Sequence, residues 1–295
     1  MKPRFPRISG LVLAALLAAS LAPGAEELSN SGFRERMTEI EHKAGGRLGV
    51  AALDTGTGRR LEFRAGERFA LCSTFKLLLV SAVLSRVDAH RETLDRLVAY
   101  GERELEDYAP IARKHLPEGG LTISELCAAV IEYSDNTAAN LLLRVIGGPD
   151  GLTRYVRSLG DPVTRLDRDE PSLNSNLPGD ERDTTSPAAM LGAMTKLLTG
   201  EVLSSVSRQQ LETWLVDSKV GATRLRAGLN PAWRVGNRTG SGEHGATNDV
   251  AIVWPLHGSP FLVAVYYTDS TSPAAVRDSV VAEVGAAVST AFGRR

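Results

Sequence analysis

The segment Arg168-Asp169-Glu170-Pro171-Ser172-Leu173-Asn174 decides how the rest of the chain is interpreted. It places a carboxylate, a rigid proline and a carboxamide in a polar stretch that fits neither a regular helix nor a regular strand. Three short motifs stand around it in a fixed order: Ser73-Thr74-Phe75-Lys76, Ser134-Asp135-Asn136 and Arg238-Thr239-Gly240. Together the four supply a nucleophile, proton carriers, an anion-binding cation and a group that can activate water. This set predicts a serine hydrolase that clears its acyl-enzyme quickly.

Ser73 and Lys76 are three residues apart at the predicted start of a helix, so both side chains share one face. A serine hydroxyl needs a neighbouring base to take its proton, and a lysine whose pKa is lowered by burial can be that base. The alternative is a capping serine followed by a surface lysine. We favour catalysis, because an idle lysine beside the apolar run Leu77-Leu78-Leu79-Val80 would be costly.

The motif Ser134-Asp135-Asn136 has a structural and a chemical interpretation. Structurally, it breaks one predicted helix and caps the next, which we expect to begin near Thr137. Chemically, Ser134 can pass a proton to a leaving nitrogen while Asn136 binds a substrate amide.

The motif Arg238-Thr239-Gly240, continued by Ser241 and Gly242, follows a strand predicted at residues 233–237. An arginine beside a threonine offers a carboxylate a fork of donors and a hydroxyl. The glycines let another backbone or a ligand approach closely. The alternative is an ordinary edge strand with a surface arginine.

Glu170 and Asn174 are four residues apart, so a carboxylate and an amide can hold one water between them. A general base in such a site accelerates a reaction by on the order of a hundredfold or more. A solvated loop glutamate is the alternative. The surrounding segment, residues 161–185, is long, polar and proline-bearing, as functional loops often are.

Bulk composition is that of an ordinary globular protein of 295 residues, with 43% hydrophobic and 23% charged residues. The formal net charge of −1 provides no basic field for nucleic acid, so we expect no polynucleotide partner. The five histidines are scattered without ligand spacing, so we expect no metal and no cofactor. Cys72 and Cys127 both lie in apolar patterns, and we expect them to be unpaired.

The N-terminus has the layout of a secretory signal peptide. Lys2, Arg4 and Arg7 precede an apolar run at residues 11–19, and small residues follow as far as Ala25. The run is short for a membrane span, although an uncleaved anchor is the alternative. We therefore assign residues 1–25 to a signal peptide and expect a periplasmic or secreted protein with no stable membrane association after its removal.

Hydrophobic periodicity predicts strands near both ends of the chain and helices between them. A helix capped by Ser31 should bury Phe33, Met37 and Ile40. Strands are predicted at residues 48–53, 60–63, 233–237, 248–254 and 261–268, and helices at 124–131, 140–146, 186–198 and 272–291. The fold class is α+β: an antiparallel sheet of about five strands flanked by N- and C-terminal helices, with an inserted all-α lobe. Residues 26–69 with 216–295 should form the α/β lobe, and residues 70–215, with the loop 165–183, the all-α lobe.

The four motifs in this order resemble those of the class A serine β-lactamases, and the resemblance covers nearly everything after the signal. It implies a β-lactamase/transpeptidase-like fold, a small-molecule β-lactam as substrate, penicillins and cephalosporins included, and a monomer. It implies catalytic roles for Ser73, Lys76, Ser134 and Glu170. It also implies substrate-binding roles for Tyr108, Asn136, Asn174, Arg224, Arg238, Thr239, Gly240 and Ser241.

The resemblance implies further details of the site. Glu170 would activate the deacylating water, whereas either Lys76 or Glu170 would be the acylation base. Backbone N–H groups of Ser73 and Ser241 would form the oxyanion hole. Arg168 and Asp183 would pair across the neck of the loop, and the Glu170–Pro171 bond would be cis.

Three departures from the family pattern bear on specificity. Arg238 stands where most members have lysine, as in some carbenicillin-hydrolysing members, and cannot give up a proton. Thr247 stands where many members have a second substrate-binding arginine, which Arg224 would replace from another segment. Gly242 stands where carbapenem-hydrolysing members often have a cysteine, so we expect weak carbapenem turnover.

Two other protein classes share parts of this pattern. A penicillin-binding D-alanyl-D-alanine peptidase shares the serine and lysine motifs and the carboxylate-binding motif found here at residues 238–240, but Glu170 argues against it. A β-lactam sensor domain stays acylated, so it should lack a deacylating base and follow a membrane segment. A purely structural protein would leave Lys76 unexplained.

Overall fold

The computed structural model describes residue 1 and residues 29–293. Apart from Met1, the predicted signal peptide therefore lies outside the described residues. Within them, no helix is long and apolar enough to cross a membrane.

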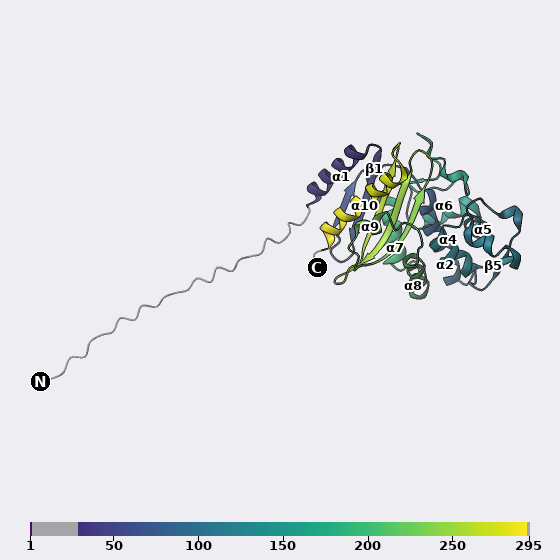
Figure 1. Ribbon diagram of the computed structural model, residues 1–295. Coiled ribbons are helices and arrows are strands. Elements are labelled where there is room, and N and C mark those ends of the chain that lie inside the picture. The colour runs from purple at the N-terminus through teal and green to yellow at the C-terminus, as the bar shows by residue number, and fades with distance from the viewer. Residues whose placement is uncertain (2–28, 294–295) are drawn as a thin grey trace.

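One five-stranded sheet joins the two ends of the chain (Figure 1). Its strands, in spatial order, are β2 (Arg60–Phe63), β1 (Arg47–Asp54), β9 (Phe261–Thr268), β8 (Thr247–Trp254) and β7 (Arg234–Ser241). Every neighbouring pair is antiparallel, and β1 pairs with β9 along its whole length, from Arg47 opposite Thr268 to Asp54 opposite Phe261. The predicted sheet built from both termini is confirmed.

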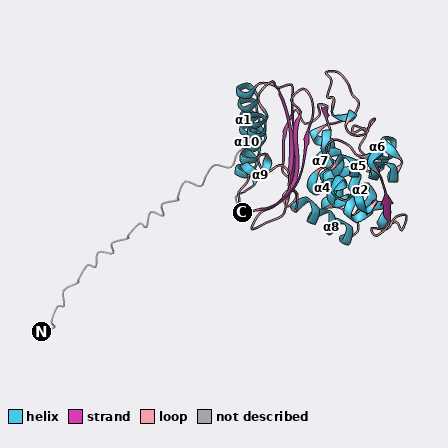
Figure 2. Cartoon of the chain, turned by 45° about the vertical axis from the view of Figure 1, so that its right-hand side comes forward, coloured by secondary structure: helices cyan, strands magenta, loops and turns pink. Residues whose placement is uncertain are grey.

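Alternation along the strands gives the sheet two apolar faces. Val50 and Ala52 of β1 pack with α1 (Asn30–Ala44) and α10 (Ala274–Phe292). Ala51 and Leu53 point the other way, into the core of the helical lobe. This is the period of two expected of a strand buried on both sides. Figure 2 shows α1, α10 and the short α9 (Leu225–Gly228) on one side of the sheet and the other helices on the opposite side.

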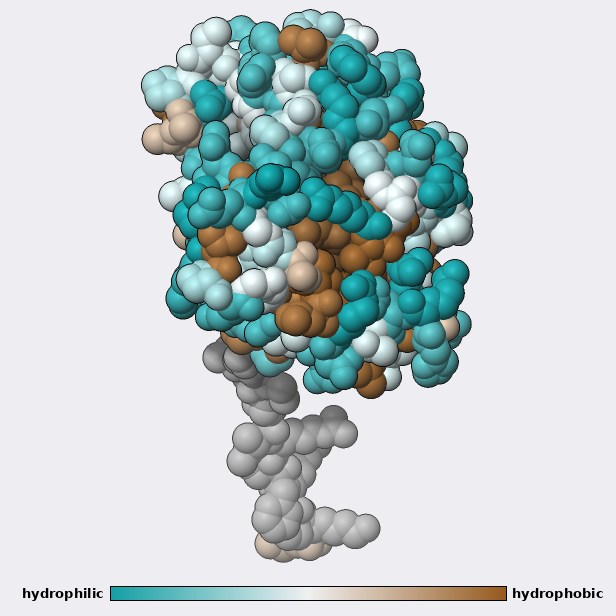
Figure 3. Space-filling view, turned by 90° about the vertical axis from the view of Figure 1, so that its right-hand side faces the viewer, coloured by the Kyte–Doolittle hydropathy of each residue, from teal (hydrophilic) through white to brown (hydrophobic). Residues whose placement is uncertain are grey.

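The inserted lobe is built around α2 (Phe75–Asp88), whose residues from Phe75 to Leu84 are all buried. Its other helices are α3 (Pro110–Lys114), α4 (Ile123–Tyr133), α5 (Asn136–Ile146), α6 (Gly148–Ser158), α7 (Pro187–Leu198) and α8 (Ser205–Val216). Helix α7 packs on β1 and β9 and so joins the lobe to the sheet. Figure 3 looks at the end of the molecule formed by this lobe, where a mainly hydrophilic surface surrounds a hydrophobic area near the centre of the view and several smaller ones.

The sequence analysis predicted an all-α inserted lobe, but the lobe is not purely helical. It contains two short antiparallel ribbons, one of β3 (Phe69–Ala70) with β6 (Thr184–Thr185) and one of β4 (Leu97–Ala99) with β5 (Gly120–Thr122). These strands are too short to show a period of two in the sequence. Helices α6 and α8 were also not predicted.

Most predicted boundaries differ from the observed ones by one or a few residues, and three of the differences bear on capping or on the site. Helix α1 is capped by Ser29, whose hydroxyl accepts from the Gly32 N–H (3.1 Å), so Ser31 lies inside the helix. Helix α5 begins at Asn136 because the Asp135 side chain accepts from the Ala138 N–H and caps it. Strand β7 continues to Ser241, so the motif that begins at Arg238 lies within the strand rather than after it. Ladder pairing with β8 continues through that motif despite its glycine and polar residues.

Candidate active site

The nucleophile lies on a tight turn that enters α2. Ser73 belongs to the 3-10 turn η1 (Cys72–Thr74), where Cys72 has a positive φ of 42°. The Leu71 carbonyl accepts from both the N–H (3.2 Å) and the hydroxyl (2.6 Å) of Thr74. The Asn248 amide of β8 donates to the Ala70 carbonyl (2.9 Å). These bonds hold the Ser73 hydroxyl at the junction of the two lobes.

Lys76 is fully buried, and its ammonium is surrounded by oxygen atoms. Nζ lies 3.1 Å from Ser73 Oγ, 2.9 Å from Glu170 Oε1 and 2.6 Å from Asn136 Oδ1, and it also donates to the carbonyl of Ser134 (2.8 Å). Burial lowers the pKa of Lys76 to about 8, with Glu170 acting in the opposite direction. At pH 7 the Lys76 side chain is still protonated in most molecules, but removing its proton requires less free energy than removing one from an exposed lysine.

Glu170 points into the site and is only 2% exposed. Its Oε1 accepts from the Ser73 hydroxyl (3.3 Å), and its Oε2 accepts from the Asn174 amide (2.6 Å). The peptide bond between Glu170 and Pro171 is cis, as predicted. The carboxylate thus lies beside the nucleophile instead of in solvent, contrary to the alternative of a solvated loop glutamate.

Ser134 closes the other side of the nucleophile. It has a left-handed backbone (φ 64°) at the end of α4, and its hydroxyl donates to Ser73 Oγ (3.2 Å). The Arg238 guanidinium donates to the Ser134 hydroxyl. Asp135 accepts from the N–H groups of Ile111 and Ala112 (both 2.9 Å), which ties the motif to α3.

Arg238 is buried behind Ser134 and does not line the cavity. Its Nε and Nη1 have no hydrogen-bond partner among the described residues. Burial lowers the pKa of Arg238 to about 10, so it stays charged at neutral pH. Nearby, burial raises the pKa of Asp249 to about 6, and its carboxylate accepts from the Asn237 amide (3.0 Å). In this structure the Arg238 guanidinium therefore does not line the cavity as the predicted fork of donors, and it lies buried against Ser134 as a positive charge.

A cavity of about 430 Å³ brings together most of the predicted substrate-binding residues. Its lining includes Ser73, Tyr108, Ser134, Asn136, Asn174, Arg224, Thr239, Gly240, Ser241 and Asp278. Tyr108 stands at the rim with half of its surface exposed, and its carbonyl accepts from the Asn136 N–H (3.0 Å).

Arg224 lies at the cavity wall, held by bonds to three elements. Its guanidinium donates to Asp278 Oδ1 of α10 (2.8 Å), to the carbonyls of Gly240 (2.8 Å) and Asn248 (2.9 Å), and to Ser241 Oγ (2.7 Å). Asp278 was not identified from the sequence, because a single carboxylate in a long helix carries no signal.

Close packing explains the glycines that follow Arg238. A Cβ on Gly240 would lie 3.0 Å from the Leu71 carbonyl oxygen and 3.2 Å from the Ser73 nitrogen. One on Gly242 would lie 2.7 Å from Cys72 Sγ. Strand β7 therefore packs directly on the nucleophile turn. Both cysteines are free and buried, as predicted, and burial raises the pKa of Cys72 to about 12.

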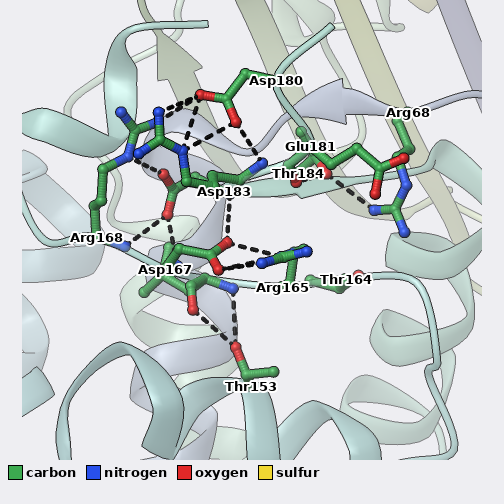
Figure 4. Close-up of polar contacts among 12 residues, drawn as sticks. Arg68, Thr153, Thr164, Arg165, Asp167, Arg168, Asp180, Glu181, Asp183 and Thr184 are labelled. Atoms are coloured by element: carbon green, nitrogen blue, oxygen red, sulfur yellow. Dashed lines mark hydrogen bonds and ion pairs between the residues drawn. The ribbon is translucent and has the colours of Figure 1, made fainter.

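The loop that carries Glu170 is closed at its neck by an ion pair between a partly buried arginine and a buried aspartate (Figure 4). Arg168 Nε lies 2.6 Å from Asp183 Oδ2, as predicted, and Asp183 Oδ1 accepts from the N–H groups of Asp167 (2.7 Å) and Arg168 (2.9 Å). The Asp183 carbonyl accepts from the Leu71 N–H (2.8 Å), so the neck also touches the nucleophile turn.

Asn140 of α5 is a site residue that the sequence analysis missed. Its Oδ1 accepts from the Glu170 N–H (3.0 Å) and its Nδ2 donates to the Glu170 carbonyl (2.9 Å). A polar residue on the buried face of α5, beside Ala139 and Leu141, was the available signal. In the described part of the chain, no group of three or more His, Cys, Asp or Glu residues could hold a metal ion.

Comparisons with known proteins agree on one family. A model of the "Beta-lactamase enzyme family" matches residues 32–292. The β-lactamase OXY-2 of Klebsiella oxytoca is 41% identical over 271 residues, which cover 92% of this chain and 93% of that protein. The β-lactamase CTX-M-97 of Escherichia coli is 42% identical over 259 residues, covering 88% and 89%.

Solved structures give the same result. An ancestral class A β-lactamase (GNCA) has a TM-score of 0.87 and 56% identity over 88% of this chain and all of that one. The putative class A β-lactamase PenP of Rhodopseudomonas palustris has a TM-score of 0.86 and 50% identity over 88% and 99%. With the serine, lysine and glutamate in mutual contact, the chain belongs to the class A serine β-lactamases, which hydrolyse the β-lactam amide bond through a serine acyl-enzyme.

Proposed function

We propose that Ser73 attacks the β-lactam carbonyl and that Glu170 activates the water that later cleaves the ester. The main observation in support of this proposal is that the buried Glu170 carboxylate contacts both the Ser73 hydroxyl (3.3 Å) and the Asn174 amide (2.6 Å). A water that replaces the direct contact would be held between carboxylate and amide. In that place it would lie next to the ester carbon.

Proton transfer in acylation has two available acceptors, because Lys76 Nζ (3.1 Å) and Glu170 Oε1 (3.3 Å) both contact the Ser73 hydroxyl. Ser134 passes a proton to the departing nitrogen, since its hydroxyl lies between Ser73 and the ammonium of Lys76 (3.2 Å from each). The N–H groups of Ser73 and Ser241 serve as the oxyanion hole, which is supported by the close packing of β7 on the nucleophile turn.

Substrate recognition divides the cavity into two ends. Thr239, Ser241 and Arg224 bind the substrate carboxylate, and Arg238 adds positive charge from beneath. Asn136 binds the acylamide side chain, with Tyr108 at the entrance. Penicillins and cephalosporins share this carboxylate and acylamide, so both are within the proposed substrate class. Weak carbapenem turnover remains a prediction.

We further propose that the chain is exported by a signal peptide at residues 1–25 and acts as a monomer in the periplasm or outside the cell. The charged and apolar pattern of the N-terminus supports the proposed export.

The α/β lobe at 26–69 with 216–295 and the helical lobe at 70–215 form the two walls of the cavity.

The test is a Glu170→Gln variant, which keeps the size of the side chain but removes the base. Benzylpenicillin should still label Ser73, and the adduct should persist at least about a hundredfold longer than in the wild type in intact-protein mass spectrometry. The exposed Glu102→Gln is the control and should clear its adduct at the wild-type rate. Clearance by Glu170→Gln at that same rate would exclude Glu170 as the deacylating base.

A further inference from the structure

The carboxylate of Glu106 reaches the rear of the catalytic loop through one intermediate side chain. Asn140 Nδ2 donates to Glu106 Oε1 (3.0 Å) and, with its second hydrogen, to the Glu170 carbonyl (2.9 Å). Asn140 Oδ1 accepts from the Glu170 N–H (3.0 Å). The backbone of Glu170 is thus held on both sides by one amide, and Glu106 holds that amide from behind.

Glu106 and the backbone of Glu170 require the same orientation of the Asn140 amide. An ionised carboxylate accepts hydrogen bonds and donates none, so it requires Nδ2 on its side. If the amide turned over, Oδ1 would face both the carboxylate and the Glu170 carbonyl, while Nδ2 would face the Glu170 N–H. All three bonds would then be lost. A bond to a charged acceptor is also stronger than one to a neutral acceptor.

The Glu106 side chain is not needed to place its own loop. The Glu106 N–H donates to Thr137 Oγ1 (2.7 Å), and its carbonyl accepts from the Arg113 guanidinium (2.8 Å). These backbone bonds remain when the side chain is replaced. The carboxylate can therefore be changed with little effect on the path of residues 104–108, including Tyr108 at the cavity rim.

The surroundings of Glu106 disfavour the ionised form of its carboxyl group unless a hydrogen-bond donor stabilises it. Burial raises the pKa of Glu106, and repulsion by Asp169, Glu170 and Asp107 raises it further. The hydrogen bond from Asn140 has the opposite effect. The ionised carboxylate and the amide therefore stabilise one another.

We propose that Glu106 is a positioning residue that, through Asn140, fixes the backbone of Glu170 for the deacylation step. The inference rests on the role proposed above for Glu170. When the support is removed, the Glu170 carboxylate is less often in line with the ester. Acylation would continue while hydrolysis of the ester slows, so acyl-enzyme would accumulate.

Two variants test the proposal. Glu106→Leu removes the acceptor, and we expect kcat for benzylpenicillin to fall about tenfold, with KM falling in parallel and acyl-enzyme becoming the main species in quenched-flow mass spectrometry. Glu106→Gln keeps an acceptor for Asn140 and should restore kcat to within about twofold of the wild type. A purely structural role would instead reduce the active fraction and leave KM unchanged.

The control is Asp107→Asn, which removes a neighbouring charge but no contact to Asn140. It should keep wild-type deacylation. The proposal is overturned if Glu106→Leu turns over normally, if it loses activity without accumulating the adduct, or if Asp107→Asn slows deacylation equally. Glu170→Gln is measured alongside. If its adduct persists while Glu106→Leu turns over normally, the role of Glu106 is rejected and the role of Glu170 is not.

Discussion

At the scale of single residues, Lys76 shows how burial converts a common side chain into a reagent. Desolvation lowers its pKa to about 8 from the ordinary 10.5, although Glu170 lies 2.9 Å away and favours the ammonium. The neutral amine therefore becomes more abundant as pH rises through 8. If Lys76 takes the Ser73 proton, kcat/KM should rise in the same range.

Lys76→Arg tests this directly, because a guanidinium keeps both the charge and its proton. We expect kcat/KM for benzylpenicillin to fall by on the order of a hundredfold and its rise with pH to disappear, measured between pH 6 and 9. An unchanged pH profile in the variant would assign acylation to Glu170 instead.

At the scale of elements, the loop that carries Glu170 depends on the acceptors of its neck. Asp183 is fully buried and accepts three bonds, two from backbone N–H groups and one from Arg168. Asp183→Ala should lower the free energy of unfolding in urea by about 3 kcal/mol, since it leaves two backbone N–H groups without their acceptor and removes the nearer of the two carboxylates that pair with Arg168. Limited proteolysis should then cut between residues 168 and 183.

The matched comparison lies in the same loop. Arg182 pairs with Asp180 at 2.8 Å, but the Arg182 side chain is half exposed and solvent screens the pair, so Arg182→Ala should leave the urea unfolding midpoint close to that of the wild type. Equal losses of stability in the two variants would mean that the Arg168–Asp183 pair stabilises the loop no more than the exposed Arg182–Asp180 pair does.

The elements also show what could be predicted from the sequence. Strands β1 and β9 have strong apolar patterns, so the sheet built from both termini was predicted. The four motifs identified the residues around Ser73 because their chemistry is local. Asn140 is marked only as a polar residue on the buried face of α5, and its contacts with Glu106 and Glu170 span 30 or more residues, so no local pattern identifies its partners. The buried position of Arg238 was missed for the same reason.

At the scale of the whole molecule, the site exists only where the two lobes meet. The helical lobe supplies Ser73 and Ser134, and the sheet lobe supplies the groups proposed to bind the substrate carboxylate. Arg224 joins the parts on the sheet side, since one guanidinium bonds to α10, β7 and β8. The bonds of its guanidinium to Asp278, Gly240, Asn248 and Ser241 do not include Ser73, so its removal should weaken recognition of the carboxylate more than it disturbs the nucleophile.

We expect Arg224→Ala to raise KM for benzylpenicillin about tenfold or more, because a charged donor pair is lost. The methyl ester of the same penicillin has no carboxylate and should show a much smaller change. Arg224→Lys retains the charge and should recover part of the loss for the acid only. Equal effects on acid and ester would show that Arg224 holds β7, β8 and α10 together without contacting the substrate, and the carboxylate would then be bound by Thr239, Ser241 and the field of Arg238.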